Sequence, residues 1–336
     1  MSTLNVDIVN ATAGFVPASY TTANLPTGQA VGSIVYDSTE QSIKVFDGSS
    51  WRGAASSAVT ASGGNNIFTE DGHTVHIFTG TGTFSVTNSG MVEYLVVAGG
   101  GAGGGGDVGG GGGAGGLLYG RALFSAGSYA VSVGAGGTGI QSSGSYGGKG
   151  IDSQLGPYIA KGGGGGGGWG AGQQTQGSGG SGGAATSSNR TGYGIKGQGN
   201  DGGYPGRGSP NYPQPGGGGA GEPGQPSYSH FITGRGGDGR AVPIISTTNA
   251  LNYNVGQVYD DQVWFAGGGA GGAESNQNPD IPTERGGLGG GGKGGRQTNN
   301  LNAVAGTART GGGGGGEDPQ AGANGGSGVV IVRYKN

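Results

Sequence analysis

Short runs of hydrophobic residues stand near both ends of the chain and are separated by long polar and glycine-rich stretches. Runs at 33–36 and 42–46, separated by the turn-forming residues 37–41, predict a β-hairpin. Further runs rich in β-branched and aromatic residues predict strands at 76–79, 83–86, 93–97, 129–133 and 329–332. The pattern therefore favours a mostly β fold to which the last residues of the chain contribute.

Glycine divides the chain into two parts. Of the 93 glycines in the 336 residues, only five fall in residues 1–62. We therefore expect a domain boundary near Gly63, between a small β-hairpin module with a linker at 25–62 and a glycine-rich domain at 63–336.

The first part of the chain is too small to bury much apolar surface. Because an isolated hairpin is marginal in water, the hairpin at 33–46 should pack on a partner, on copies of itself or on the next domain. Threefold cyclic symmetry would satisfy that need, and we expect a homotrimer. Residues 1–24 are polar and predict an extended attachment segment, whose candidate contact residues are Val6, Ile8 and Val9.

Three kinds of structure have to be considered for so much glycine. A flexible linker is the first, since Gly/Ser tracts behave as random coils, but strands at both ends of the glycine-rich part argue against it. Collagen is the second, but the seven glycines at 162–168 break the Gly-X-Y period, and 13 prolines are too few. The third is a bundle of glycine helices of the polyproline II type.

Such a bundle, called polyglycine II, can satisfy the backbone. Its helices have no internal hydrogen bonds, so each N–H and C=O needs a partner in a neighbouring helix, and only glycine lets the backbones approach closely enough. The predicted fold is therefore mostly β and irregular. A β-rich lobe at 67–97, 128–135 and 329–334 clamps a bundle of polyglycine-II helices.

Composition and charge exclude several classes of protein. The chain has no cysteine, which excludes disulfides and thiol catalysis. A net charge of -3 with 10% charged residues gives no basic footprint for nucleic acid. No apolar stretch approaches the ~18 residues of a membrane span, and the first residues lack the basic and apolar regions of a secretory signal.

No motif in the chain predicts catalysis, a metal ion or a cofactor. At this glycine content, G-x-G-x-x-G recurs by chance. Residues 287–293 imitate a phosphate-binding loop, but Gly294 stands where such a loop needs Ser or Thr. His73 and His76 are three residues apart and would point to opposite faces of a strand, which is wrong for one metal ion.

The segment at 193–231 is the most informative polar stretch, because prolines and aromatic residues interleave with glycine there. Proline restricts a loop and tyrosine offers rigid amphipathic contact area, so the segment suits recognition; covering the edge of the bundle is the structural alternative. Trp169 and Trp264 are expected to be packing residues. The candidate receptor contacts are Tyr204, Tyr212, Tyr228, His230 and Phe231, together with Asn276 and Asn278 from a polar loop at 274–282.

Several segments resemble known sequences when taken in order. FTGTGTFSV (78–86), EYLVVAGGGAGGGG (93–106) and GGSGVVIVRY (325–334) lie in a stretch, 64–336, that resembles the glycine-rich domain of bacteriophage tail-fibre and adhesin proteins. The hairpin GSIVYDSTEQSIKVFDGSSW (32–51) is similar to a small module of marine phage fibre proteins.

This resemblance implies a protein on the exterior of a phage virion, often the receptor-binding tip of a fibre, whose loops between the glycine helices recognise the host. We therefore expect an adhesin that contacts other virion proteins through its N-terminal segment and binds a host surface protein or polysaccharide. No enzymatic activity, cofactor, nucleic-acid binding or membrane insertion is expected. The alternatives are a purely structural fibre, whisker or capsid decoration protein, and an ice-binding protein, against which the irregular Tyr- and Pro-bearing loops argue.

Overall fold

A computed structural model describes residues 16–336, except 41, 54–57, 107, 142–144, 169–173, 187–190, 207–212, 229–231, 274–284, 297–300 and 318–319. The chain divides into two compact units, Met1–Ala58 and Val59–Asn336. The position near Gly63 at which the glycine content of the sequence rises lies inside the second unit rather than at its edge. The reason is that β5 (Thr60–Ser62) already pairs with β8 (Gly82–Asn88). The described residues form a mostly β structure with long irregular segments.

The first unit is a four-stranded sheet with the order β1-β2-β3-β4. The predicted hairpin is formed by β2 (Ile34–Asp37) and β3 (Ser42–Phe46), and β4 (Trp51–Gly53) extends it. The attachment segment predicted at 1–24 is described from residue 16 onwards. There, β1 (Ser19–Tyr20) pairs in parallel with β2, and a 3-10 turn, η1 (Thr22–Asn24), follows.

The core of the first unit is thin. Val35 and Phe46 are its buried hydrophobic side chains among the residues described. The ring of Trp51 lies 5.4 Å from that of Phe46, and its indole N–H donates to the carbonyl oxygen of Pro26 at 2.7 Å. Ile34 and Ile43, on the other face of the sheet, are 46% and 44% exposed. A unit with so little buried apolar surface is marginally stable by itself.

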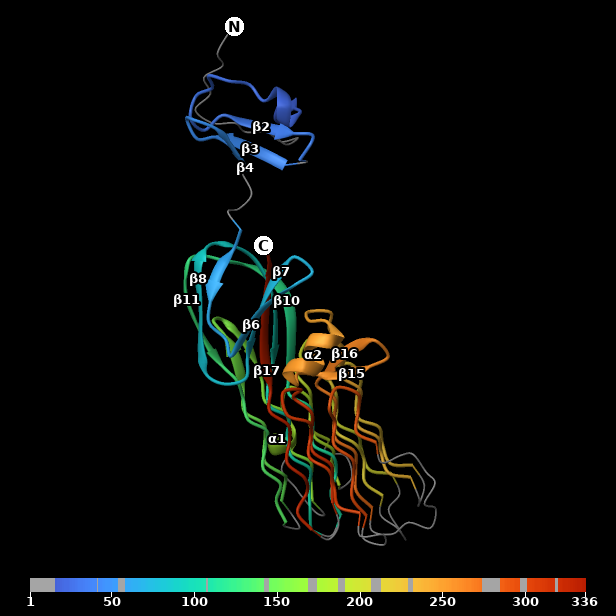
Figure 1. Cartoon of the computed structure of the whole chain (residues 1–336). Helices are drawn as coiled ribbons and strands as arrows, with labels where there is room; N and C mark the ends of the chain where they lie inside the picture. Colours follow the sequence, from blue (N-terminus) through green and yellow to red (C-terminus); the bar gives the residue numbers. More distant parts are fainter. Residues whose placement is uncertain are drawn as a thin grey trace. The chain divides into compact units, whose positions relative to one another are not determined.

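Two five-stranded sheets form the β-rich part of the second unit (Figure 1). The first has the order β10-β9-β17-β7-β6, formed by Leu117–Phe124, Gly90–Val97, Val329–Lys335, His73–Phe78 and Asn66–Glu70. The second has the order β13-β12-β11-β8-β5, formed by Tyr158–Ala160, Ser153–Leu155, Gly127–Ser132 and the β8 and β5 strands given above. The sequence predicted β7, β8, β9, β11 and β17 of these sheets and missed β5, β6, β10, β12 and β13.

The second unit also contains a third layer. The sequence did not predict this layer, except for a packing segment around Trp264. It contains a three-stranded sheet with the order β14-β16-β15, formed by Arg240–Ala241, Gln262–Phe265 and Gln257–Tyr259, and the helix α2 (Thr247–Tyr253). Ser246 begins α2 by accepting a hydrogen bond from the N–H of Asn249. A further short helix, α1 (Gln174–Gly177), lies among the glycine-rich segments.

The strand at the end of the chain lies between two cores. Alternate residues of β17 point to opposite faces, so Val329 and Ile331 pack with the α2 layer while Val330 and Val332 pack with the second sheet. All four are fully buried. This position explains why the strand is a continuous apolar run rather than an alternating one.

The glycine-rich segments lie side by side beyond the sheets (Figure 1) and are joined by backbone hydrogen bonds. Residues 99–104 show the pattern, because their N–H groups donate in rotation to three neighbouring segments. Gly99 and Ala102 donate to Ile151 and Gly148, Gly100 and Gly103 to Gly326 and Ala323, and Gly101 and Gly104 to Gly113 and Gly110. A return to the same neighbour at every third residue is the period of a polyproline II helix.

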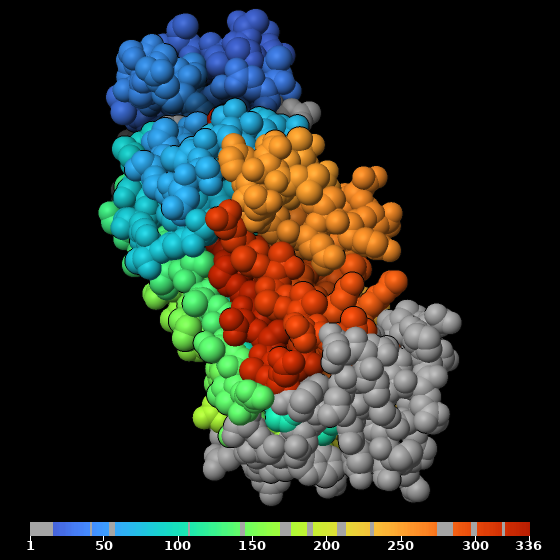
Figure 2. Space-filling model, turned by 60° about the horizontal axis from the view of Figure 1, so that its bottom comes forward, coloured from blue at the N-terminus to red at the C-terminus, as the bar shows by residue number. Residues whose placement is uncertain are grey.

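The carbonyl groups of the same segment bind three other neighbours. Gly99 and Ala102 accept from Gly163 and Gly166, Gly101 and Gly104 from Gly314 and Glu317, and Gly100 from Gly137. The helix at 99–104 therefore has six neighbours, with N···O distances of 2.8 to 3.1 Å. This is the predicted bundle of polyglycine-II helices, which we call the glycine lattice. In Figure 2 its C-terminal part (red) lies between residues near 150 (green) and residues near 250 (orange).

The spacing of the lattice leaves no room for most side chains. A methyl group on Gly101 would lie 2.1 Å from the carbonyl oxygen of Gly164, and one on Gly113 would lie 2.3 Å from that of Ser181. Real Cβ atoms essentially never approach within 3.0 Å of another heavy atom. The glycine content therefore follows from the close approach of the backbones.

The sheets fix the register of the lattice. The antiparallel pairing of β9 with β10 ends at Val97 and Leu117, and the same register continues as Ala98, Gly101 and Gly104 donate to Gly116, Gly113 and Gly110. The pairing of β9 with β17 continues in the same way, as Gly100 and Gly103 donate to Gly326 and Ala323. Each strand pair thus aligns the glycine helices that extend from it.

His76 on β7 links Gly63, which follows β5, to Tyr334 on β17. It is buried, its Nδ1 lies 2.6 Å from the carbonyl oxygen of Gly63, and its Nε2 lies 3.0 Å from the hydroxyl of Tyr334. The carbonyl can only accept, so Nδ1 carries the proton and the neutral ring accepts from Tyr334 at Nε2. Burial lowers the pKa of His76 below its ordinary value.

Substituting Gly101 by alanine tests the steric requirement of the lattice. We expect Gly101→Ala to lower the free energy of unfolding by about 3 kcal/mol or more, because the carbonyl it would strike belongs to backbone that is itself hydrogen-bonded. Gly80→Ala is the matched control, since nothing lies within 4 Å of a Cβ there, and it should change stability by no more than about 0.5 kcal/mol. Equal effects in urea denaturation would contradict the lattice.

Acid should destabilise the fold through His76. The pKa is lower in the folded chain, so the unfolded chain binds the proton first, and stability falls as pH drops through the ordinary value of 6.5. We expect the loss of unfolding free energy between about pH 7.5 and about pH 5.5 to be smaller in His76→Gln than in the unaltered protein. His73→Gln, on the same strand, is the control and should keep the full loss; an unchanged pH dependence in His76→Gln would disprove the assignment.

Candidate functional site

The outer surface of the glycine lattice carries a groove of about 580 Å³. Four neighbouring segments line it, and each contributes a glycine together with the residue before it. These pairs are Lys149-Gly150, Lys161-Gly162, Ser178-Gly179 and Tyr193-Gly194, and Asp152 and Ile195 complete the lining. We call this site the lattice groove.

The floor of the lattice groove is bare backbone. Hydrogen bonds hold its segments together, from Gly150 to Gly163 at 2.9 Å, from Gly180 to Gly162 at 2.8 Å and from Gly179 to Tyr193 at 3.1 Å. A methyl group on Gly150 would lie 1.9 Å from the carbonyl oxygen of Gly99 in the next layer. Because close packing requires glycine here, the floor stays free of side chains.

The walls of the lattice groove carry charge and an aromatic ring. Lys161 Nζ donates to Asp152 at 2.7 Å, and the N–H of Gly162 donates to the other oxygen of the same carboxylate at 2.8 Å. Tyr193 is 55% exposed, and its N–H donates to the hydroxyl of Ser178 at 3.0 Å. The negative charge of Asp152 is thus compensated within the wall.

A second hollow of about 290 Å³ adjoins the lattice groove at Gly194. Lys196, Asp201 and Pro223 line this part together with Gly199 and Asn200. Asp201 accepts the N–H of Gly194 at 2.8 Å, and the side-chain amide of Asn200 donates to the carbonyl oxygen of Gly219 at 2.9 Å. Gly194 lines both hollows, so they are neighbours on the surface.

The structure describes two of the receptor contacts predicted from the sequence. Tyr204 and Tyr228 are 58% and 57% exposed, and neither lines the lattice groove. Trp264 lies on β16, between the buried residues Val263 and Phe265. The other predicted residues lie outside the described part of the chain: Tyr212, His230, Phe231, Asn276, Asn278, Val6, Ile8, Val9 and Trp169.

The sequence prediction missed the lysines of the lattice groove. Lys149 and Lys161 each precede a glycine, and nothing in the sequence near them differs from many other glycine-rich stretches. Tyr193 begins the polar segment that the sequence singled out, but its aromatic neighbours were preferred. A weak signal was available, because lysine is rare in this chain and three of its six lysines line the two hollows.

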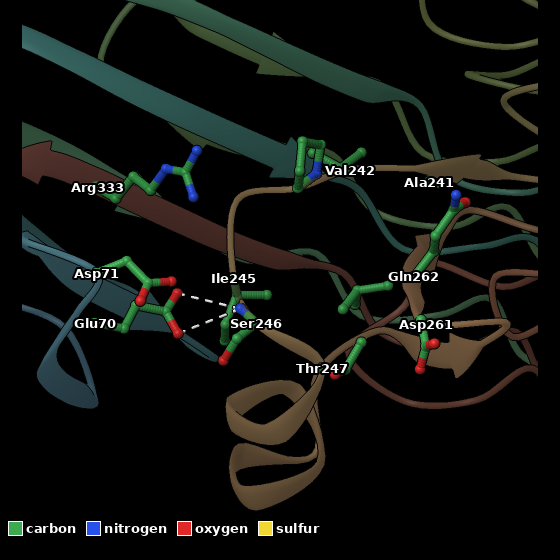
Figure 3. A pocket seen from close by; sticks show the side chains of 12 residues that line it. Glu70, Asp71, Ala241, Val242, Ile245, Ser246, Thr247, Asp261, Gln262 and Arg333 are labelled. Atoms are coloured by element: carbon green, nitrogen blue, oxygen red, sulfur yellow. Dashed lines mark hydrogen bonds between the residues drawn. The ribbon is translucent and has the colours of Figure 1, made fainter.

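A separate pocket of about 450 Å³ opens beside the α2 layer (Figure 3). Val242, Ile245 and Val263 form apolar parts of its lining, while Glu70, Asp71, Ser246, Thr247, Asp261 and Gln262 supply polar groups. Both carboxylate oxygens of Glu70 accept the N–H of Ser246, at 3.2 and 3.3 Å, and one accepts the side-chain amide of Asn249 at 2.8 Å. Glu70 therefore secures the start of α2.

The positively charged side chain that lines this pocket, Arg333, also has a partner. Arg333 is ion-paired with Glu93, whose other carboxylate oxygen accepts the hydroxyl of Tyr119. Burial and this hydrogen bond raise the pKa of Tyr119 to about 12. Polar contacts around the pocket thus join the first sheet to the α2 layer. The exposed carboxylates of Asp71 and Asp261 lie in hairpin turns, where the two residues have positive φ angles of 47° and 53°.

The described residues contain no group of three or more His, Asp or Glu side chains placed to hold a metal ion. His73 and His76 lie on β7 at positions that alternate between its two faces, and of the two only His76 is buried. In the same part of the chain, no helix is long and apolar enough to cross a membrane.

The sequence of the second unit matches a known family. The profile of a family described as a glycine-rich domain matches residues 77–335, a stretch that begins in β7 and ends in β17. It includes the central strands of the first sheet and the whole glycine lattice. No curated protein matches the chain. The chain therefore belongs to the glycine-rich domain family.

Proposed function

We propose that this protein is an adhesin on the exterior of a bacteriophage virion, in a tail fibre, and that it binds a host surface molecule through segments displayed by the glycine lattice. The observation that carries the proposal is the lattice itself. Its interior holds backbones by hydrogen bonds in three directions, so side chains larger than alanine are displayed mainly at its margins. Such a scaffold presents recognition groups on a support that does not depend on them.

The margin of the lattice has the chemistry of a recognition surface. Tyr204 and Tyr228 present more than half of their surface to solvent, and the prolines of this segment restrict its backbone. Rigid tyrosine-bearing segments lose little conformational entropy on binding, which favours affinity for a protein or a saccharide. The resemblance of the chain to phage adhesins agrees with this use of the surface.

The first unit supplies the attachment function in this proposal. Ile34 is paired with Val45, and Tyr36 with Ile43, so these four side chains share one face of the sheet. That face is half-buried to exposed, whereas the core behind it is thin. Association of three copies, or with another virion protein, would cover the apolar face and stabilise the unit.

Binding of the purified protein to host cells tests the proposal. We expect labelled protein to bind bacteria on which the phage forms plaques, and Tyr204→Ala combined with Tyr228→Ala to weaken binding about tenfold or more, since exposed tyrosines are frequent binding hot spots. Tyr259→Ala is the matched control, because Tyr259 is 56% exposed but lies on β15, outside the lattice.

Two outcomes would decide against the adhesin. If no susceptible strain binds the protein, the function fails. If electron microscopy then places the glycine lattice against other virion proteins rather than at a free tip, a structural fibre, whisker or decoration role replaces it. Thermal hysteresis in solution would instead indicate an ice-binding protein, an outcome that we do not expect.

A further inference from the structure

We propose that the lattice groove and the hollow that adjoins it at Gly194 bind a neutral saccharide. The ring of Tyr193 packs against a sugar ring, and the carboxylate of Asp201 accepts hydrogen bonds from sugar hydroxyl groups. The proposal deepens the adhesin function and rests on it, since it names the ligand class for one part of the displayed surface. It does not involve Tyr204 or Tyr228, neither of which lines the two hollows.

The charged side chains of the two hollows are matched within the chain. Lys161 is ion-paired with Asp152 in the lattice groove, and Lys196 and Asp201 line the second hollow together. Lys149 has an interaction partner of its own. Ionic attraction is therefore not what this surface offers a ligand, and an uncharged ligand suits it best.

Tyr193 supplies a flat apolar surface on a fixed backbone. It is 55% exposed, its N–H donates to the hydroxyl of Ser178 at 3.0 Å, and its carbonyl oxygen accepts the N–H of Gly179 at 3.1 Å. Ile195, which is 41% exposed, lies two residues further along and lines the same groove. The C–H faces of pyranose rings pack well on such a surface, and a ring on an anchored backbone loses little entropy on binding.

Asp201 and Asn200 supply fixed acceptors beside that ring. One carboxylate oxygen of Asp201 accepts the N–H of Gly194 at 2.8 Å, and the amide nitrogen of Asn200 donates to the carbonyl oxygen of Gly219 at 2.9 Å. Within the described part of the chain, no hydrogen bond reaches the other carboxylate oxygen of Asp201 or the side-chain oxygen of Asn200. Sugar hydroxyl groups are donors that fit these two oxygens.

Gly194 connects the two parts of the proposed site. It follows Tyr193 in the chain and donates to Asp201, so the aromatic ring and the acceptors belong to one hydrogen-bonded unit. The hollows on its two sides have volumes of about 580 and 290 Å³, and small-molecule sites typically measure ~300–1,000 Å³. Together they have room for a ligand with more than one sugar ring.

A protein ligand is favoured less. The centre of a protein–protein interface typically buries several aromatic and apolar anchors. The described lining of the two hollows supplies three such side chains, Tyr193, Ile195 and Pro223, among polar groups and glycines. Binding of the protein to host cells whose glycans have been oxidised with periodate is therefore an outcome that would replace the saccharide by a protein.

The experiment measures the affinity of the full chain for three neutral polysaccharides, dextran, mannan and galactan, by isothermal titration calorimetry. Alginate, which has a carboxylate on each sugar, is the charged comparison. We expect at least one neutral polymer to bind with an affinity that does not change between about 0.05 and 0.5 M salt, because no ion pair forms. Alginate should bind about tenfold more weakly or not at all.

Two variants test the assigned roles. Tyr193→Ala should weaken binding about tenfold or more, whereas Tyr193→Phe, which keeps the ring, should weaken it less than about threefold. Asp201→Asn keeps an oxygen for the N–H of Gly194 but loses the charged acceptor, and it should weaken binding about tenfold.

Tyr259→Ala is the matched control, because Tyr259 is 56% exposed and lines neither hollow. It should leave the affinity unchanged, and all variants should keep the unfolding midpoint of the unaltered protein. The proposal is overturned if none of the three neutral polymers binds, if alginate binds more tightly than all of them, or if Tyr259→Ala weakens binding as much as Tyr193→Ala.

The cell-binding assay separates this proposal from the adhesin function. If cells bind the protein while none of the polymers does, and Tyr193→Ala leaves cell binding intact, the saccharide assignment fails and the adhesin stands. If a neutral polymer binds through Tyr193 and Asp201 but no susceptible strain binds the protein, the saccharide assignment stands and the adhesin fails.

Discussion

The hydrogen bond between bare backbones of neighbouring segments of the chain is the interaction on which this structure depends. In an ordinary core, apolar side chains hold elements together and the backbone is satisfied within helices and sheets. Here the N–H groups of one segment turn to three neighbours in succession, and its carbonyls turn to three others. Side chains would separate the backbones and break these bonds, so the same constraint sets both the geometry and the amino-acid composition.

The hydrogen bonds of the glycine lattice are not sufficient by themselves to stabilise it. Ordering glycine removes more backbone entropy than ordering any other residue, and each hydrogen bond returns only about 1 kcal/mol. The two cores of the sheets supply apolar burial where the lattice has almost none, and β9, β10 and β17 lead directly into glycine helices in unchanged register. The sheets therefore reduce the number of alignments that the glycine segments can adopt, since a run of identical residues cannot specify its own register.

These facts explain how far the sequence could be interpreted. The strands around Val96, Val131 and Ile331 were predictable because their side chains carry a β pattern, and the lattice was predictable because collagen and linkers could be excluded. The α2 layer was missed because residues 240–265 are short elements among polar turns. The groove was missed for a deeper reason, since Lys149, Lys161 and Tyr193 are brought together by a register that the glycines themselves do not encode.

The lattice also changes how a binding surface can vary. In most folds, an exposed side chain stands on an element whose other face packs in the core, so substitutions on one face are coupled to the other. A residue at the margin of this lattice adjoins backbone whose partners are carbonyl and amide groups, as Gly150 does beside Lys149. Side chains displayed there can change with little effect on the interior, because the interior contains backbone rather than interlocking side chains. A scaffold held by main-chain bonds thus separates the requirements of stability from those of recognition.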